Sequence, residues 1–509
     1  MSEVNRLNGK TVLVIGAGIM GAGIAQVAAQ AGHPVLLYDA NPAVPEQARA
    51  KLTATFDKLV SKGKFTADEV ATIMARIQPV SELQAAANAA LVVEAIIENL
   101  DIKRSVFAEL ESIVSKDCIL ATNTSSISVT AIANGLQHPE RLVGMHFFNP
   151  VPLMKLVEVV SGLQTDKAVA EAIYQLSAHW GKVPVYAKST PGFIVNRIAR
   201  PFYAETLALL QEQAAQPVVL DACLKAVGFR MGPCELMDLI GHDTNFSVTR
   251  SVYEANFYDK RFVPSLVQQE LVDGGLLGRK SGQGFYDYRD GAVQPLLSEY
   301  VRPDTVPEGD VIVLGSGPVA DLLAARLQQA GVKFDRARQS DEVGVQLPDL
   351  TLCLTDGRVA AVHPGGDVVV FDLPLNDTEG AVLAYAVAGH APEGLADSAA
   401  FWLRVLGFNP QRLADVPGLV VARTLAMLIN EAADAVHQGV CSVADANAAM
   451  KMGVNYPKGP LEWMDDWDIQ AVNTLVDTLD DWYCGERYRV SPWLRQQALA
   501  AEFTGRDSE

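Results

Sequence analysis

The segment Thr11–Gly23 constrains the fold of this chain more than any other stretch. An apolar run is followed by Gly16, Gly18 and Gly21 in the spacing G-x-G-x-x-G, and a helical pattern then continues to Gln30. The first glycine permits a tight turn, the second lets a pyrophosphate approach the backbone, and the third lets the helix pack closely on the strand. The helix N-terminus offers unpaired N–H groups to negative charge. The segment therefore predicts a buried parallel strand and a helix that together bind a dinucleotide.

A second apolar run, Pro34–Tyr38, ends in Asp39, about 20 residues after the glycines, which is the spacing of an acid that contacts ribose. A carboxylate there accepts hydrogen bonds from ribose hydroxyl groups and repels a 2′-phosphate, and no arginine follows in Ala40–Pro42. The pattern favours NAD over NADP. The alternative is a glycine-rich turn with an incidental aspartate.

Composition disfavours several classes of protein. No apolar run reaches the roughly 18–20 residues that a membrane span needs, and residues 1–10 lack the apolar core of a signal peptide. The six cysteines form no C-x-x-C pair, so we expect reduced thiols in a cytoplasmic protein, with neither a metal site nor a disulfide framework. A formal net charge of −19 disfavours nucleic acid as a partner.

Polar side chains cluster at the ends of the predicted strands that follow, which cover residues 90–96, 118–122, 142–147 and 155–160. Glu98, the stretch Asn123–Ser126 and His146 lie where a doubly wound sheet binds its ligands. Histidine suits the role of a base because its unperturbed pKa of about 6.5 lies near neutral pH. Glu158, twelve positions after His146 and within an apolar strand, is the predicted carboxylate partner. A core histidine and an edge-strand carboxylate are the alternatives.

The character of the chain changes near Lys188. The sequence Ser-Thr-Pro at 189–191 predicts a helix start, and the apolar helix that we expect over residues 192–214 carries Asn196. Further helices are expected to continue to Leu277. A glycine-rich loop at 278–286, which contains Lys280, and a linker at 289–309 follow.

After the linker the chain repeats itself. Residues 310–315 are apolar, and Gly315, Gly317 and Ala320 follow in the spacing G-x-G-x-x-A. Residues 416–421 match 190–195 at an offset of 226, and residues 459–462 match 232–235 at an offset of 227. This regularity indicates an internal duplication of a two-domain unit. The offset between the two glycine motifs is larger, at 299, so the second sheet domain is the shorter one. The predicted domains and linker are 1–188, 189–288, 289–309, 310–413 and 414–509.

Four segments together resemble the family of NAD-dependent L-3-hydroxyacyl-CoA dehydrogenases. They are the glycine motif at 16–21 and the sequences Asn-Thr-Ser-Ser at 123–126, His-Phe-Phe-Asn-Pro at 146–150 and Thr-Pro-Gly-Phe-Ile-Val-Asn-Arg at 190–197. With its second half, the chain is similar to the long bacterial members that are associated with phenylacetate degradation and oxidise 3-hydroxyadipyl-CoA. The resemblance implies a Rossmann-type α/β dinucleotide-binding domain and an all-α domain, duplicated in tandem with a shortened, degenerate second Rossmann-like domain.

The resemblance also implies roles for individual residues. His146 takes the 3-hydroxyl proton while C3 passes hydride to NAD, Glu158 offsets the charge on the ring, and Ser125 and Asn196 hold the substrate oxygens. The implied cofactor contacts are Gly16, Gly18, Ile19, Met20, Gly21, Asp39, Glu98, Lys103, Ser125, Asn149 and Lys280. Lys62 and Lys64 match the region that meets the coenzyme A phosphates, so they act locally against the negative net charge.

The second copy departs from the pattern at these positions. If residues 370–374 match 146–150, the base has become Val370, while Asn196 corresponds to Ala422, Glu158 to Ala384 and Asp39 to Arg338. We expect this half to be inactive and to bind no NAD, with residual nucleotide binding left open by its glycine motif. We also expect the tandem copy to supply an intrachain pseudo-dimer surface in place of the pairing of short family members. A homo-oligomer is the alternative.

The sequence thus predicts a cytoplasmic NAD-dependent (S)-3-hydroxyacyl-CoA dehydrogenase with one active half and an acyl-CoA substrate. The alternatives are a preference for 3-hydroxybutyryl-CoA, a general role in fatty-acid β-oxidation, or a non-catalytic NAD-binding structural protein. A dicarboxylic acyl group needs a cation near its far end, for which Arg197, Arg200, Arg230 or another residue is a candidate.

Overall fold

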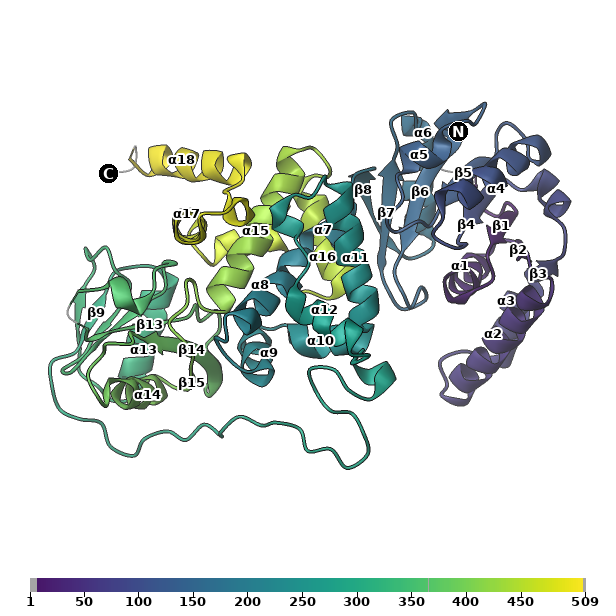
Figure 1. Ribbon diagram of the computed structural model, residues 1–509. Coiled ribbons are helices and arrows are strands. Elements are labelled where there is room, and N and C mark those ends of the chain that lie inside the picture. The colour runs from purple at the N-terminus through teal and green to yellow at the C-terminus, as the bar shows by residue number, and fades with distance from the viewer. Residues whose placement is uncertain (1–6, 365, 507–509) are drawn as a thin grey trace. The chain divides into compact units, whose positions relative to one another are not determined.

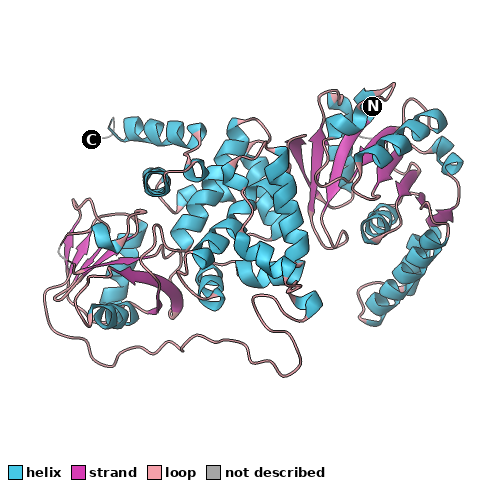
Figure 2. Ribbon diagram, in the orientation of Figure 1, coloured by secondary structure: helices cyan, strands magenta, loops and turns pink. Residues whose placement is uncertain are grey.

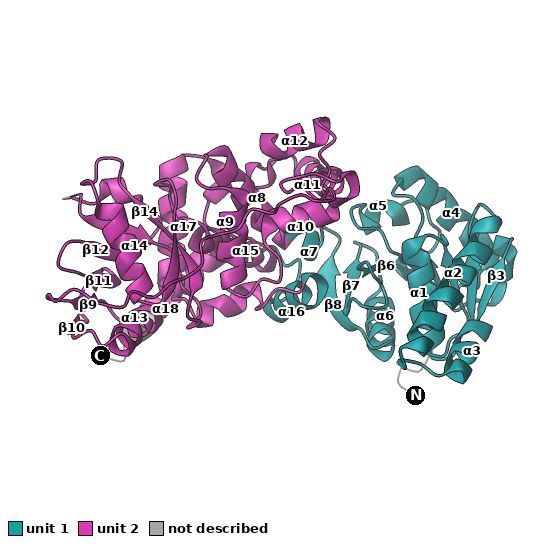
Figure 3. Cartoon of the chain, turned by 90° about the horizontal axis from the view of Figure 1, so that it is seen from below, with its two compact units in different colours: residues 1–197, 438–454 teal, residues 198–437, 455–509 magenta. Residues whose placement is uncertain are grey.

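The computed structural model describes residues 7–364 and 366–506. Figures 1 and 2 show its helices and strands, which belong to two compact units. The first unit contains residues 1–197 and 438–454, and the second contains residues 198–437 and 455–509; Figure 3 colours them separately. A short piece of the C-terminal half is therefore part of the first unit. Among the described residues, no helix combines the length and the apolar character needed to cross a membrane.

An eight-stranded sheet forms the centre of the first unit, in the order β3-β2-β1-β4-β5-β6-β7-β8. Its neighbouring strands run parallel except for β6 and β7, which are antiparallel. The bounds are β1 Val12–Ile15, β2 Val35–Tyr38, β3 Ile77–Val80, β4 Leu91–Glu94, β5 Ile119–Thr122, β6 Leu142–Phe147, β7 Leu156–Ser161 and β8 Val183–Lys188. The predicted strands are all present. The sequence reasoning missed β3 and β8, which lie at the two edges of the sheet and each contain a proline.

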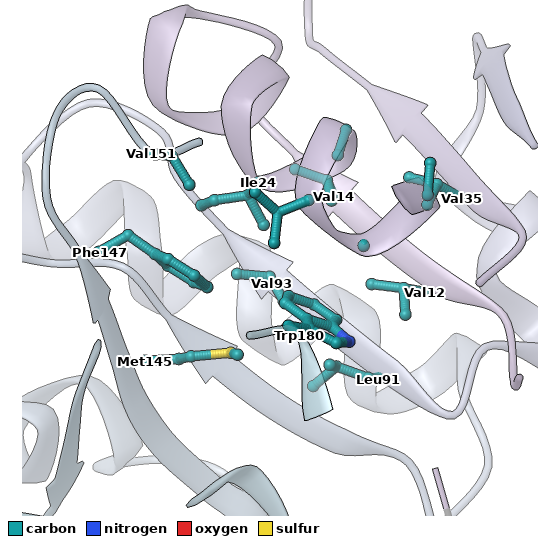
Figure 4. Packing of buried hydrophobic residues seen from close by; sticks show 14 of the residues in the cluster. Val12, Val14, Ile24, Val35, Leu91, Val93, Met145, Phe147, Val151 and Trp180 are labelled. Atoms are coloured by element: carbon teal, nitrogen blue, oxygen red, sulfur yellow. The ribbon is translucent and has the colours of Figure 1, made fainter. Parts of the chain in front are cut away.

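Helices cover the sheet and enclose an apolar core. They are α1 Ile19–Gln30, α2 Ala43–Ser61, α3 Ala67–Ala75, α4 Leu100–Ile113, α5 Val129–Ala133, α6 Lys167–His179 and α16 Val443–Val454. Figure 4 shows how Val14, Ile24, Val93, Phe147 and Trp180 gather in the core cluster. Every residue of the strands β1, β4 and β5 is buried, so the core holds these strands in place. The candidate site lies at their ends.

The helix expected to start at 192 begins later and is interrupted. Residues 191–194 form a turn, α7 covers Val195–Ile198, and α8 covers Arg200–Gln211. The hydroxyl of Ser189 does not cap this helix: its Oγ accepts a hydrogen bond from the N–H of Val129 in α5. The acceptor for the N–H groups of Ile194 and Val195 is instead the Glu158 carboxylate on β7.

The second unit contains the helices on both sides of the linker and a second sheet. The helices are α8, α9 Pro217–Ala226, α10 Pro233–Ile240, α11 His242–Ala255, α12 Leu266–Asp273, α13 Pro318–Gln329, α14 Leu395–Val405, α15 Val421–His437, α17 Ile469–Tyr483 and α18 Pro492–Arg506. The sheet has the order β10-β9-β11-β12-β13-β14-β15. Its strands are β9 Ile312–Leu314, β10 Asp335–Ala337, β11 Gly344–Gln346, β12 Thr351–Leu354, β13 Val368–Phe371, β14 Ala381–Val387 and β15 Phe408–Arg412.

The second sheet is a reduced version of the first, which confirms the predicted fold class. Residues 39–90 lie between β2 and β4, but only residues 338–343 lie between β10 and β11. Because β11 and β12 form a hairpin with no helix between them, β11 runs antiparallel to its neighbours, unlike β4. The duplication also shows in the backbone. Gly192 and Phe193 have φ angles of 76° and 47°, and their counterparts in the second copy, Gly418 and Leu419, have 70° and 50°.

The strand register corrects the predicted counterpart of His146. In the first sheet His146 pairs with Glu158. In the second, Phe371 pairs with Tyr385, and the N–H of Asp372 donates to the carbonyl of Ala384. Ala384 is the counterpart of Glu158 at the offset of 226, so Asp372 rather than Val370 stands at the position of His146. The sequence comparison missed this because it aligned residues 370–374 with residues 146–150 and did not use the antiparallel pairing of β13 with β14.

Equivalent residues of the two helical regions are cross-paired within the second unit. Glu205 accepts hydrogen bonds from Arg487, and Glu431, its counterpart in the second copy, accepts one from Arg261. Arg261 and Arg487 are counterparts at the same offset of 226. Glu205 and Glu431 lie on α8 and α15, which pack against each other. This reciprocal arrangement is the one that a two-fold symmetric interface produces.

Candidate active site

The central pair of the site is a buried histidine and a buried carboxylate on adjacent strands. Nδ1 of His146 on β6 lies 2.5 Å from Oε2 of Glu158 on β7. His146 is 5% exposed and Glu158 is fully buried. The rings of Phe148 and Phe193 lie 4.6 and 5.8 Å from the imidazole ring. The Glu158 carboxylate thus accepts a hydrogen bond from Nδ1–H of His146, which leaves Nε2 as the nitrogen with a free lone pair.

Glu158 has a second role, which the sequence reasoning did not anticipate. Its Oε1 accepts hydrogen bonds of 3.0 Å from the N–H groups of both Ile194 and Val195. These residues open the turn into α7, which carries Asn196. One carboxylate therefore orients the imidazole with one oxygen and fixes the backbone before Asn196 with the other.

Glu98 holds the loop that carries Ser125. Its Oε1 accepts hydrogen bonds from Thr124 Oγ1 at 2.6 Å and from the backbone N–H groups of Ser125 and Ser126 at 2.9 and 3.0 Å. Burial raises the pKa of this carboxyl, but these hydrogen bonds and the Lys103 ammonium outweigh it and hold the pKa below its ordinary value. Glu98 is therefore an ionised anchor for the loop after β5.

Lys103 is enclosed by two carboxylates. Its Nζ lies 2.6 Å from Oε1 of Glu94 and 3.2 Å from Oε2 of Glu98, and its side chain is 1% exposed. Glu94 also accepts a hydrogen bond from Thr122 Oγ1 at 2.7 Å. This arrangement supports a positioning role for Lys103, through Glu98, more directly than the predicted contact with a cofactor.

The glycine turn has the form that a dinucleotide requires. Gly16 has a φ of 94°, and a Cβ atom placed there would lie 2.4 Å from the carbonyl oxygen of Ala95. A Cβ on Gly21 would lie 1.7 Å from the carbonyl oxygen of Gly16, whereas one on Gly18 would point into open space. No side chain caps the N-terminus of α1, and its first turn contains no acid. These observations fit a pyrophosphate at the α1 N-terminus.

Asp39 lies at the end of β2 beside this turn. Its Oδ2 accepts a hydrogen bond from the N–H of Ala17 at 2.9 Å, and its Oδ1 accepts one from the N–H of Asn41 at 3.0 Å. A cavity of about 410 Å³ opens beside the same turn and is lined by Gly18, Ile19 and Lys51. The carboxylate is therefore fixed next to the glycines, where an acid that contacts ribose is expected.

The other predicted contact residues lie in different surroundings. Asn149 is exposed after β6, and Lys62 and Lys64 are exposed at the end of α2 and in the turn that follows. Lys280 belongs to the second compact unit, where its ammonium group pairs with Asp243. In the described part of the chain, no cluster of His, Cys, Asp or Glu side chains is arranged to hold a metal ion.

Comparison with known proteins identifies the family. Residues 11–190 match the description "3-hydroxyacyl-CoA dehydrogenase, NAD binding domain", and residues 192–288 and 418–509 match "3-hydroxyacyl-CoA dehydrogenase, C-terminal domain". Residues 352–417 match "3-hydroxybutyryl-CoA dehydrogenase reduced Rossmann-fold domain". The chain is 44% identical to a 3-hydroxyadipyl-CoA dehydrogenase of Escherichia coli K12 over 97% of its own length and 98% of that protein. The chain belongs to the NAD-dependent 3-hydroxyacyl-CoA dehydrogenase family.

Two further relatives show which parts are shared. A crystal structure described as a 3-hydroxybutyryl-CoA dehydrogenase of E. coli K12 covers 97% of the chain and 99% of its own, with a TM-score of 0.86 and 42% identity. A probable 3-hydroxybutyryl-CoA dehydrogenase of Deinococcus radiodurans is 42% identical over 54% of the chain and 99% of that protein. The 3-hydroxyacyl-CoA dehydrogenase unit thus occurs both alone and in the duplicated form.

The structure brings several predicted residues of this 3-hydroxyacyl-CoA dehydrogenase together. His146 contacts Glu158, Glu158 fixes the turn before Asn196, and Glu98 fixes Ser125. The sequence analysis did not single out Glu94, which lies in β4 and pairs with Lys103. A charged residue in an apolar strand was the available signal, because such a residue needs a buried partner.

Proposed function

We propose that the first copy oxidises the 3-hydroxyl group of an (S)-3-hydroxyacyl-CoA and that His146 is its base. The buried pair of His146 and Glu158 carries this proposal. When bound, NAD supplies the hydride acceptor for C3. Nε2 of His146 takes the hydroxyl proton as the C3–H bond breaks, and the Glu158 carboxylate stabilises the imidazolium that forms. Ser125 and Asn196 hold the substrate oxygens during this step.

We propose 3-hydroxyadipyl-CoA as the preferred substrate, in phenylacetate catabolism. The support is the name of the E. coli relative that spans nearly the whole chain. The name of the E. coli crystal structure favours 3-hydroxybutyryl-CoA as the alternative. Rates of NADH formation with the 3-hydroxybutyryl, 3-hydroxyhexanoyl and 3-hydroxyadipyl thioesters decide between them. A higher kcat/KM for the adipyl thioester is expected, and a higher value for the butyryl thioester would contradict the proposal.

A cytoplasmic location is part of the same proposal. All six cysteines are free thiols, and four of them are buried. Thiols that persist unpaired are typical of a reducing compartment.

Replacing Asp39 with alanine is expected to weaken NAD binding about tenfold, because one charge-assisted interaction with the ribose is lost. The KM for the acyl-CoA is expected to change much less. Initial rates at varied NAD and at varied acyl-CoA measure both effects, with the exposed Asp57 in α2 replaced by alanine as a control. Equal losses for the two substrates would count against the ribose role of Asp39.

We propose that the second copy is a non-catalytic pseudo-dimer partner. Ala384, Asp372, Ala422 and Arg338 stand where the first copy has Glu158, His146, Asn196 and Asp39, so the second copy lacks the base, its partner and the ribose acid. The reciprocal pairs of Glu205 with Arg487 and of Glu431 with Arg261 support an intrachain two-fold interface. One chain then supplies both halves of a surface that two subunits would otherwise form.

Reversing the charge of Arg261 tests this interface. Arg261 is 3% exposed and pairs with Glu431 and Asp434, so Arg261→Glu is expected to lower stability by about 3–5 kcal/mol. The control is Arg250→Glu, because Arg250 forms an exposed pair with Glu254 whose loss costs about 1 kcal/mol or less. Denaturant unfolding measures both variants, and sedimentation of the wild type is expected to give a monomer. A wild-type dimer that Arg261→Glu dissociates into stable monomers would refute the intrachain interface.

A further inference from the structure

Two residues of the second half of the chain contact the sequence neighbours of Asn196. The first compact unit includes a short segment of that half, which contains α16. Within this unit, the side chain of Gln438 accepts a hydrogen bond of 2.9 Å from NH1 of Arg197. A Cβ atom placed on Gly453 in α16 would lie 3.2 Å from Cγ2 of Val195. Asn196 therefore lies between two residues that the second half contacts.

Helix α16 packs closely on the first sheet at Gly453. The same Cβ atom would lie 2.5 Å from Cδ2 of Leu156 in β7, a distance at which one of the two atoms has to move. Leu156 and Val195 are both buried. The helix also packs on β8, and just before it the N–H of Lys188 donates to the carbonyl of Val440 at 2.9 Å. A glycine is thus what lets α16 lie directly against Val195.

Glu158 holds the same turn from the sheet. Its Oε1 accepts hydrogen bonds from the N–H groups of Ile194 and Val195. Val195 and Arg197 are buried, whereas Asn196 between them is partly exposed. Because α7 has only four residues, it has little stability of its own, and its position depends on the elements that contact it. The place of Asn196 is therefore set by both halves of the chain.

The two halves exchange helices reciprocally. The backbone hydrogen bond from Lys188 to Val440 has a counterpart at the offset of 226, in which the N–H of Ala414 donates to the carbonyl of Ala214 at 3.0 Å. The helices that follow are α16 and α9, and α9 packs on β14 of the second sheet as α16 packs on β7 of the first. Each sheet is thus covered in part by a helix of the other half, as in a two-fold exchange.

The side-chain contact of Gln438 is also repeated, but with a carboxylate. At the same offset, Arg197 corresponds to Arg423 and Gln438 to Glu212. NH1 and NH2 of Arg423 donate to the Glu212 carboxylate at 3.2 Å. The residue before Arg423 is Ala422, the counterpart of Asn196, so this second contact supports the fold beside a position without a polar side chain.

We propose that Gln438 and Gly453 are positioning residues for Asn196, so that the second half completes the site of the first copy. This inference rests on the proposed function, in which Asn196 holds a substrate oxygen. Gln438 acts through Arg197, and Gly453 acts by letting α16 support Val195. A displacement of about 1 Å at a site residue can cost about a factor of 10² in rate, so a support outside the site affects turnover. The second half is non-catalytic, yet the rate of the first copy depends on it.

The first test removes the side chain of Gln438 in the full-length protein. Gln438→Ala is expected to lower kcat about tenfold with the thioester that the wild type oxidises fastest, which equals about 1.4 kcal/mol. Gln438 is exposed, so the variant is expected to fold. NAD affinity in a fluorescence titration is expected to stay at the wild-type value. Gln438→Glu is expected to keep kcat within about twofold of the wild type, because Glu212 accepts the equivalent hydrogen bond as a carboxylate.

A double-mutant cycle shows whether the effect passes through Asn196. In the Asn196→Ala background, Gln438→Ala is expected to change kcat less than about twofold, because the positioned side chain is already absent. An equal loss in both backgrounds, or an unchanged kcat in the single variant, would overturn the positioning role. A wild type that forms NADH with no 3-hydroxyacyl thioester would instead overturn the proposed function.

Two further variants separate positioning from stability. Glu212→Ala removes the counterpart contact beside Ala422 and is expected to lower the denaturant midpoint of unfolding while kcat stays within about twofold. Gly453→Ala places a methyl group against Val195 and is expected to lower kcat, again only where Asn196 is present. If Gly453→Ala does not fold, the Gln438 variants decide the proposal. A loss of kcat in Glu212→Ala as large as in Gln438→Ala would show that the rate follows overall stability, and would overturn the proposal.

Discussion

Replacing His146 by alanine is expected to lower kcat about 10³-fold, because a positioned general base contributes a factor of about 10² to 10⁴. The imidazole contacts Phe148 and the Glu158 carboxylate, and an alanine at this position has no group that accepts a proton. NAD affinity is expected to be retained, because the glycine turn and Asp39 lie on other strands. Stopped-flow NADH absorbance measures turnover, and fluorescence titration measures NAD binding.

The control is His138→Ala, which removes a partly exposed histidine that pairs with Glu140. Its kcat is expected to match the wild type. Turnover in His146→Ala within tenfold of the wild type would refute the assignment of the base.

Glu158→Gln is expected to lower kcat about 10³-fold even though the side chain keeps its size. The amide oxygen can still accept hydrogen bonds from the N–H groups of Ile194 and Val195, which orients the amide NH₂ toward Nδ1 of His146. An NH₂ group at that place donates to Nδ1 and moves the ring proton to Nε2, so the imidazole no longer accepts the hydroxyl proton. Steady-state kinetics and thermal unfolding together separate this change from a loss of the fold.

The second copy offers a matched control for this variant. Asp372 accepts hydrogen bonds from the N–H groups of Val420, Val421 and Ala422, as Glu158 does from Ile194 and Val195. Asp372→Asn places an NH₂ group against these donors and is expected to lower stability by about 1–3 kcal/mol with kcat unchanged. A large loss of kcat in Asp372→Asn would show that losing such a cap is enough to lower the rate. A loss of kcat in Glu158→Gln that only follows its loss of stability would likewise show that Glu158 acts only as a cap.

Much of the first copy follows from local sequence signals. Glycine spacing, apolar strands and polar residues at strand ends are all readable within short segments, and they predicted the sheet, Asp39 and the pairing of His146 with Glu158. The last of these needed one additional step, namely that a carboxylate in an apolar strand requires a partner. The residue roles remain predictions until the variants are measured.

The features that the sequence did not reveal depend on contacts between distant segments. The helix start near 191 looked self-capped, but its acceptor is Glu158 on β7, which α6 and β8 separate from it along the chain. The counterpart of His146 was misplaced because strand register is set by pairing across β13 and β14 and not by the letters of one strand.

Helix α16 makes one step in the folding of the first sheet wait until the C-terminal part of the chain has been synthesised. This helix, Val443–Val454, packs on β7 and β8 of the dinucleotide-binding sheet, and the N–H of Lys188 donates to the carbonyl of Val440 just before it. The ribosome must therefore pass both the linker and the whole second sheet before the edge of the first sheet receives its cover. A chain that ends before α16 would leave β7 and β8 without this cover, and an uncovered edge strand favours aggregation.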